Sequence, residues 1–329
     1  MTFSFVIDYN KRNTANHHYN YILDKLCINK CFVKISPYIF VKIYDKINNV
    51  DELKNYYINN YGYIPKYIIF VYNNNFISLM SKLNIICELS KLIMITDDLH
   101  TPNDDNHKFK CNIIENAHII FSPYGYNNFN DEKYKLSQPK KLVNLYHSAR
   151  LNYICNINDN PINKILISGV INSIYIDREY AVSKQLIYPD KIDRFKKTIK
   201  YRVANHNNII CGKKYYEYLN KYLCCFCDIA YDYILAKVFE IPASGSLLLY
   251  MDKDNEKIKN IMKEMGFIDG ENYISCNRTD FIEKVMYITD PNNKSEIDRI
   301  RINGYDLIKQ HHTSENRYQT VIQNIEKYD

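Results

Sequence analysis

The chain has 329 residues, 46% of them hydrophobic, which is enough to bury a core and too many for one ordinary domain. Its net charge of +6 comes from 43 basic and 37 acidic residues spread along the chain, which favours a small anionic ligand over a nucleic-acid platform with a basic face. No stretch approaches about 18 uninterrupted apolar residues, so we expect no membrane span.

Short apolar strands alternate with helical segments through the first half of the chain. Strands are predicted at 3–7, 31–35, 67–72, 92–96, 118–122 and 142–146. Helices are predicted at 19–28, 50–59 and 107–116, the second of them closed by Gly62 and Pro65. Alternation of helices with continuous apolar strands predicts a parallel sheet covered on both faces.

Residues 151–163 are polar, rich in Asn and interrupted by Pro161, and they form the best linker in the chain. The alternation then resumes, with strands predicted at 164–169, 226–230, 246–251 and 273–276. Helices are predicted at 177–187, 189–202, 213–223, 255–265 and 280–289, with one more ending near Glu240. The tail is expected to be helical at 295–311, broken near Gly304, and at 314–327, and to cross back onto the first half.

The ten cysteines follow a start that does not resemble a signal peptide, so free thiols in a reducing compartment are the simpler interpretation. Cys224 and Cys227 have the spacing of half a zinc site. A structural zinc needs four ligands, and no second pair with suitable spacing is nearby. We therefore expect buried cysteines here and no metal site.

In open α/β sheets, ligands bind beyond the carboxyl ends of the strands, where helix N-termini favour anions. Three loops meet that description: 97–102 in the first half, and 169–178 and 242–246 in the second. Within the stretch 237–249, Glu240 precedes a Pro/Gly-bounded turn by a few residues. A carboxylate in that position can face a ligand.

Several segments of the second half together resemble the carboxyl-terminal half of glycosyltransferases of the GT-B class. They are YIDR at 175–178, KVFEIPASG at 237–245, GF at 266–267, IRINGY at 300–305, and His312-Thr313 with Arg317. The closest likeness is to the family 1-like group that includes spore-maturation-type transferases, over residues 164–317. In the first half only the general pattern and the run DDLH at 97–100 are similar.

The resemblance implies an α/β protein with two Rossmann-like domains that face each other across a cleft, with C-terminal helices crossing back to the first domain. The expected parts are an acceptor-side domain at 1–150, a nucleotide-sugar-binding domain at 164–311 and a helix at 312–329 that packs on the first domain. The implied reaction moves a sugar from a nucleotide-diphosphate donor to an acceptor hydroxyl, without bound metal or other cofactor.

The resemblance also implies roles for two carboxylates. Glu240 and Gly245 fit the second half of a motif in retaining GT-B enzymes, and Asp232 stands where the first Glu of that motif would be. Glu240 is thereby implied to accept hydrogen bonds from ribose hydroxyls. Asp232 would lie nearer the sugar or diphosphate; the alternative is that it caps a helix.

Related transferases supply cations to the diphosphate from the helix after the first strand of the second domain, and Arg178 and Lys184 are the matching residues. Arg178 is the better match because its planar fork suits phosphate oxygens. The alternative for Arg178 is a surface salt bridge with Glu179. Lys237 lies one helical turn before Glu240 and either serves phosphate or pairs with that carboxylate.

Backbone amides are further expected donors to phosphate. Gly169 and the turn Ser244-Gly245-Ser246 allow close approach of the main chain to a ligand. Glycines are concentrated in the second half of a chain that otherwise avoids them, which favours tight loops there. Ordinary helix ends would produce the same concentration.

An enzyme that inverts configuration needs a base on the acceptor side, and Asp97, Asp98 and His100 follow a predicted strand there. An enzyme that retains configuration needs no such base. The expected catalytic residues are therefore Asp98, His100 and Asp232. His147 either lines the cleft or is structural, and His311 and His312 are expected to be structural.

Two other functions remain open from the sequence: a non-catalytic carbohydrate-binding or structural protein of this fold, and a nucleotide-sugar epimerase. The expected partners are a nucleotide sugar and a glycan or other hydroxyl-bearing acceptor, with no nucleic acid. The bias toward residues with A/T-rich codons suits a large DNA virus or an A/T-rich microbe. The expected location is cytoplasmic, in host cytoplasm or virion if the source is viral.

Overall fold

The computed structural model describes residues 4–7, 17–28, 32–35, 44, 46–71, 82–95, 116–123, 142–169, 171, 175–195, 210, 212–229, 233–252 and 254–328. The chain forms two compact units. The first comprises Met1–Tyr146 together with Ser314–Asp329, and the second comprises His147–Thr313. The segment expected to be a linker, 151–163, therefore belongs to the second unit, where it begins with the short 3-10 helix Leu151–Tyr153.

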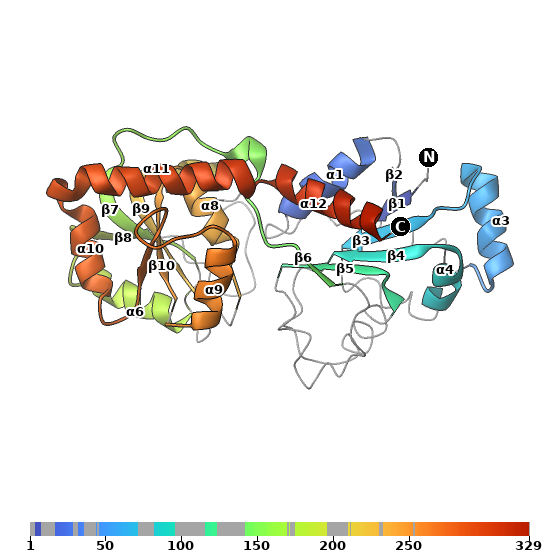
Figure 1. The fold of residues 1–329 in the computed structure, drawn as a ribbon, viewed down its shortest axis with the longest axis horizontal. Coiled ribbons are helices and arrows are strands. Elements are labelled where there is room, and N and C mark those ends of the chain that lie inside the picture. Colours follow the sequence, from blue (N-terminus) through green and yellow to red (C-terminus); the bar gives the residue numbers. More distant parts are fainter. Residues whose placement is uncertain are drawn as a thin grey trace. The chain divides into compact units, whose positions relative to one another are not determined.

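The first unit is built on a six-stranded parallel sheet (Figure 1). Its strands are β1 (Ser4–Ile7), β2 (Phe32–Ile35), β3 (Tyr67–Val71), β4 (Lys91–Ile95), β5 (Ile119–Ser122) and β6 (Leu142–Asn144), in the spatial order β2-β1-β3-β4-β5-β6. Each pair of neighbours is parallel, as the apolar strands predicted.

Helices cover both faces of this sheet. Helices α1 (His17–Ile28) and α12 (Ser314–Lys327) share one core cluster with Ile69, whereas α3 (Val50–Tyr61) and α4 (Leu83–Leu89) share another with Ile68. Successive residues of β3 thus point to opposite cores, which is why the strands read as continuous apolar runs. Helix α4 was not predicted, because seven residues are too few to show a helical period.

The second unit repeats the same strand order. Its strands are β7 (Ile162–Ile167), β8 (Ile192–Arg194), β9 (Tyr222–Asp228), β10 (Leu247–Met251) and β11 (Ile274–Cys276), in the order β11-β10-β9-β7-β8, all parallel. In each unit the first strand lies between the second and the third. This is the doubly wound, Rossmann-like arrangement, and the strand order of the second unit reverses beside β7.

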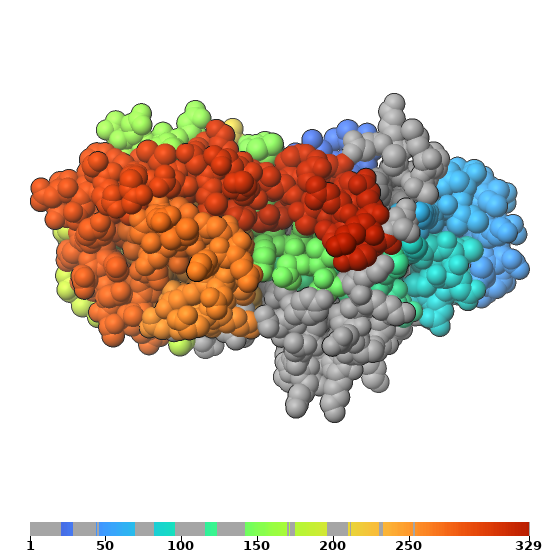
Figure 2. Space-filling model, in the orientation of Figure 1, coloured from blue at the N-terminus to red at the C-terminus, as the bar shows by residue number. Residues whose placement is uncertain are grey.

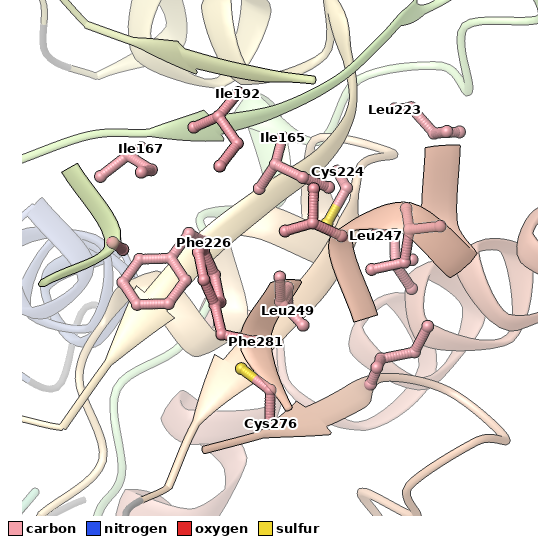
Figure 3. Packing of buried hydrophobic residues seen from close by; sticks show 14 of the residues in the cluster. Ile165, Ile167, Ile192, Leu223, Cys224, Phe226, Leu247, Leu249, Cys276 and Phe281 are labelled. Carbon is pink, nitrogen blue, oxygen red and sulfur yellow. The ribbon is translucent and has the colours of Figure 1, made fainter. Parts of the chain in front are cut away.

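One face of the second sheet is covered by α6 (Ile176–Gln185), α10 (Phe281–Thr289) and the first turns of α11 (Lys294–His311). Figure 3 shows the apolar side chains on this face, among them Ile167, Phe226 and Phe281. Helices α7 (Lys213–Leu219) and α8 (Lys237–Ala243) contact β9, and α8 also contacts β10. In Figure 2 the residues of α11 form a continuous ridge along this unit, beside those around α9 (Glu256–Glu264).

Several secondary-structure predictions for this unit were wrong. Residues 192–194 form strand β8, where the sequence predicted a helix, because Ile192 is buried and pairs with Ile165. Strand β9 begins four residues earlier than predicted, which ends the preceding helix at Leu219.

Helix α11 runs unbroken through Gly304, because this glycine serves close packing and not a helix break. A β-carbon added there would lie 2.4 Å from the carbonyl oxygen of Asn272. The final helix α12 agrees with the predicted range 314–327 and packs on α1 in the first unit (Figure 1).

Candidate functional site

A cluster of charged side chains lies where the strand order of the second unit reverses. Strand β7 is followed there by Ser168 and Gly169, and neighbouring β9 ends at Asp228. This is the edge at which open α/β sheets bind ligands, because the loops from adjacent strands diverge there. The N-terminus of α6 and the first turn of α8 supply the remaining side chains.

Arg178 lies in the first turn of α6 and is held by Asp228. Its backbone N–H donates to Oδ2 at 3.1 Å, its Nε donates to Oδ1 at 3.1 Å, and its Nη2 forms an ion pair with the same Oδ1. The guanidinium carbon also lies 3.9 Å from the centre of the Tyr175 ring. Because Arg178 is only 3% exposed, it is not the surface residue that a salt bridge with Glu179 would require.

Two cationic groups converge on Gly169. A β-carbon built on this residue would lie 2.6 Å from Nζ of Lys237 and 2.7 Å from Nη1 of Arg178. The φ of Gly169 is +109°, a conformation that other residues rarely adopt. The absence of a side chain at this position therefore lets both cations approach the main chain, where Nζ of Lys237 donates to the carbonyl oxygen of Ser168.

Lys237 and Glu240 are one turn apart on α8, and burial shifts the pKa of both. Desolvation, followed by the charge of Arg178, lowers the pKa of Lys237 from 10.5 to about 8. Desolvation raises the pKa of Glu240 from 4.5 to about 7, and the nearby Lys237 acts in the opposite direction. Shifts of this kind in a cluster of polar groups are typical of functional sites.

The Glu240 carboxylate is unused in this arrangement. It forms neither an ion pair with Lys237 nor any hydrogen bond to the residues that the structure describes. The charge of Glu240 influences two tyrosines of α7. Burial is the larger cause and the Glu240 charge the second cause that raises the pKa of Tyr215 and of Tyr216. The hydroxyl of Tyr215 lies 3.0 Å from Oγ of Ser168, so it borders the same cluster.

The turn Ser244-Gly245-Ser246 occupies a different place from the one expected of a phosphate loop. Both serines are fully buried: Oγ of Ser244 donates to the carbonyl of Ile241 at 2.6 Å, and Oγ of Ser246 lies 2.7 Å from the carbonyl oxygen of Leu219 and 2.9 Å from that of Tyr222.

A β-carbon on Gly245 would meet Asn220 and Ile157, each at 3.2 Å. In this structure, the turn joins α8 to β10, and its serine hydroxyls form hydrogen bonds inside the protein.

The remaining predicted site residues divide into two groups. Lys184 lies at the far end of α6, with its Nζ 4.8 Å from the centre of the Tyr180 ring, and no observation links it to the cluster at Gly169. Asp98, His100 and Asp232 lie outside the described residues. His312 is buried, stacks on Phe267 and hydrogen-bonds the carbonyl of Met265 at 2.7 Å, in agreement with its expected structural role.

The sequence analysis missed Asp228, Ser168 and Tyr215. Asp228 was not recognised as a candidate because the strand was predicted at 226–230. That prediction placed its carboxylate inside the strand and not at the carboxyl end. The signal that could have revealed it is the acidic residue that closes the uninterrupted buried run 222–228.

The part of the chain that the structure describes contains no group of three or more His, Cys, Asp or Glu side chains placed to hold a metal ion. Cys224, Cys225 and Cys227 are fully buried thiols, as predicted, and burial raises the pKa of each. Among the described helices, none combines the length and apolar character required to cross a membrane.

Comparison with known families and structures gives a consistent result. Residues 164–323 match the family described as "Glycosyl transferase-like". No curated protein sequence matches the chain.

Several solved structures align with nearly the whole chain, and three of them illustrate the likeness. An α-glucosyltransferase in complex with UDP-glucose and DNA containing an abasic site has a TM-score of 0.62 at 12% identity, covering 99% of both chains. Sucrose-phosphate synthase from Thermosynechococcus elongatus has a TM-score of 0.58 at 11% identity, also covering 99% of both. A glycosyltransferase from Rickettsia africae ESF-5 has a TM-score of 0.56 at 10% identity, covering 99% of this chain and 98% of its own. At these identities the likeness shows the fold, which is GT-B.

Proposed function

We propose that this chain is a family 1-like glycosyltransferase that depends on a nucleotide sugar, and that the cluster at the carboxyl ends of β7 and β9 binds the donor. The observation that carries the proposal is the convergence of two cationic side chains on a glycine at the reversal of strand order. A diphosphate is the part of the donor that requires such a place.

Each member of the cluster has a distinct part in donor binding. Nη1 of Arg178 and Nζ of Lys237 donate to diphosphate oxygens above Gly169, where no side chain intervenes. Glu240, whose carboxylate accepts no hydrogen bond from the described residues, accepts those of the ribose hydroxyls. Arg178 is already fixed by Asp228, so little side-chain freedom is lost when phosphate binds.

In the reaction, the bond between the anomeric carbon and the diphosphate oxygen breaks, and the oxygen of the acceptor hydroxyl forms the new bond to that carbon. The proton of the hydroxyl passes to the departing diphosphate in a retaining enzyme, or to a base in an inverting one. Negative charge then develops on the departing diphosphate. Arg178 and Lys237 stabilise this charge from fixed positions in a partly buried site, where electrostatic interactions are stronger than in water. We propose that these cations replace a metal ion, so that activity survives treatment with a chelator.

The catalytic roles of Asp98, His100 and Asp232 stay predictions. Asp232 falls in the short connection between β9 and α8, which bear Asp228 and Glu240. That position in the sequence supports a role near the donor sugar. A cytoplasmic location also stays a prediction; it is supported by Cys224, Cys225, Cys227 and Cys276, which are buried free thiols.

Calorimetry with UDP-, GDP- and ADP-sugars tests the proposal. We expect one class of donor to bind, and Glu240→Ala to weaken binding by about tenfold, the loss of a hydrogen bond to a charged group. Glu264→Ala, at the exposed end of α9, is the matched control and should bind as the unaltered protein does. Failure of every donor to bind would contradict the donor site.

The same experiments separate the alternatives. A non-catalytic protein would bind a sugar or nucleotide without turnover, and an epimerase would convert the donor in the absence of an acceptor. The α-glucosyltransferase of similar fold is in complex with DNA, so duplex DNA belongs in the acceptor panel beside glycans. The modest and dispersed positive charge of this chain predicts that DNA will not be an acceptor.

A further inference from the structure

We propose that Asp228 is a positioning residue for the transfer reaction: it fixes the orientation of the Arg178 guanidinium so that Nη1 points at Gly169, where the diphosphate binds. The proposal rests on the donor site described above. No sequence motif led to this residue, and its role follows from contacts between β9 and α6.

Asp228 forms a hydrogen bond with the first turn of α6. Tyr175, at the N-cap of this helix, makes no capping bond with its side chain. Oδ2 of Asp228 instead accepts the backbone N–H of Arg178, a donor that the helix itself leaves without a partner. Because Asp228 is the last residue of β9, a fully buried strand in the middle of the sheet, it ties the start of the helix to the core of the unit.

The other oxygen of Asp228 sets the rotation of the guanidinium. Oδ1 accepts from both Nε and Nη2, which form one edge of the planar group. The Tyr175 ring covers one face of that plane, with its centre 3.9 Å from Cζ. The remaining nitrogen, Nη1, is thereby directed to the point above Gly169. Asp228 does not occupy the edge that faces the proposed phosphate position.

Asp228 also acts on the second cation. The groups that influence Lys237 come from three elements: Arg178 of α6, Cys227 and Asp228 of β9, and Glu240 of α8. Arg178 lowers the pKa of Lys237, whereas Asp228 and Glu240 raise it. Loss of the Asp228 charge should therefore favour the neutral form of Lys237 and move the alkaline decline of diphosphate binding to lower pH.

Asp228→Asn is the informative variant, because the amide keeps the size of the side chain and removes its charge. Asp252→Asn is the matched control. Asp252 is buried at the same edge of the sheet, one residue past β10, and accepts hydrogen bonds from Oγ of Ser275 at 2.7 Å and from the backbone of Asp254 at 2.9 Å. The Asp252→Asn variant therefore measures the effect of removing the charge of a buried carboxylate that forms no ion pair with Arg178 or Lys237.

The first measurement is calorimetric titration of the full chain with UDP and with inorganic pyrophosphate across the range from about pH 6 to about pH 9. We expect Asp228→Asn to weaken both by about tenfold or more near neutrality and to shift the alkaline decline to lower pH. Asp252→Asn should stay within about threefold of the unaltered protein. Unchanged or tighter binding by Asp228→Asn, or an unmoved alkaline decline, would overturn the proposal.

The second measurement follows hydrogen exchange at Nε of Arg178 by nitrogen-15 NMR without any ligand. Slow exchange is expected in the unaltered protein and in Asp252→Asn, and fast exchange in Asp228→Asn. Equal exchange in all three would overturn the positioning role. If UDP and pyrophosphate fail to bind the unaltered protein, the donor site is wrong, and this result still decides what Asp228 does.

Neither measurement is possible on a variant that does not fold. We therefore include Asp228→Glu as a second variant and check the folding of both variants by thermal melting. The longer side chain keeps the negative charge and misplaces the oxygens. It should restore the alkaline decline toward its original pH but leave UDP binding weak. Full recovery of affinity by Asp228→Glu would contradict a role for the exact geometry.

Discussion

The two ends of the segment that runs from α8 into β10 differ in how their polar groups are used. At one end, Lys237 and Glu240 have shifted pKa values, and the Glu240 carboxylate has no hydrogen-bonding partner among the described residues. At the other end, the hydroxyls of Ser244 and Ser246 are fully buried and bonded to carbonyl oxygens. Burial of polar groups alone therefore does not mark a ligand site; here the site is marked by charged groups with shifted pKa values and by a carboxylate that the described residues leave without a hydrogen bond.

The largest expected effect is that of Gly169→Ala, which places a carbon at the point where Arg178 and Lys237 converge. Both neighbours are the ends of side chains, so the protein can fold by moving them, at the cost of strain at the positive φ of residue 169, and donor affinity should fall by about 100-fold. Gly62→Ala is the control, since its φ is also positive, at +77°, and nothing lies within 4 Å. Comparable melting temperatures with affinity lost only in Gly169→Ala would support the assignment; equal affinities would contradict it.

Lys237→Met should weaken donor binding by about 10-fold to 100-fold, because it removes a charged donor to phosphate. The same change should stabilise the fold near neutral pH by roughly 1–3 kcal/mol, since charged Lys237 is disfavoured in the folded state.

The sign follows from proton binding. Between about pH 8 and pH 10.5 the unfolded chain binds more protons at Lys237 than the folded chain, so the unaltered protein gains stability as pH rises through that window. Denaturant titrations at several pH values measure this gain, which should be absent in Lys237→Met. A destabilised Lys237→Met would show that the lysine is structural.

Glu240→Gln should weaken donor binding by about tenfold and change stability in a pH-dependent way. The pKa of Glu240 is raised in the folded state, so the folded chain binds more protons between pH 4.5 and about 7, and the unaltered protein loses stability as pH rises through that window. Glu240→Gln should therefore be more stable than the unaltered protein above about pH 7, by roughly 1–3 kcal/mol, and the gain should fade toward pH 4.5. A stability difference that does not vary with pH would contradict the shifted pKa.

Ser246→Ala should have the smallest effect on donor binding, with affinity unchanged within about twofold. It should instead destabilise the fold by about 1–3 kcal/mol, because the hydroxyl that the carbonyls of Leu219 and Tyr222 share as a donor is lost from the interior. Thermal unfolding and calorimetry on the same preparation measure both effects. Loss of donor affinity without loss of stability would contradict this prediction and show that the turn takes part in donor binding.

The sequence was sufficient to predict the alternating strands and helices of both units, because strands buried on both faces read as continuous apolar runs. It was insufficient for β8, whose three residues show no period, and for α11, where Gly304 suggested a break that close packing on Asn272 explains. The resemblance pointed to Arg178 and Glu240, the sequence itself pointed to Lys237 and Gly169, and the structure brings these four together.

The contact between Arg178 and Asp228 could not be predicted in the same way. The two residues are 50 positions apart, and they meet only because β7 lies beside β9 in the folded sheet. The sequence likewise could not separate the two ends of 237–246. Which hydroxyls and carboxylates are satisfied depends on distant carbonyls such as those of Leu219 and Tyr222.

A crystal structure of the protein with bound UDP tests the central claim most directly. It should show the diphosphate above Gly169, within about 3 Å of Nη1 of Arg178 and Nζ of Lys237, with the ribose hydroxyls donating to Glu240. The nucleotide bound elsewhere, with Lys237 still on the carbonyl of Ser168 and Glu240 still without a partner among the described residues, would contradict the account.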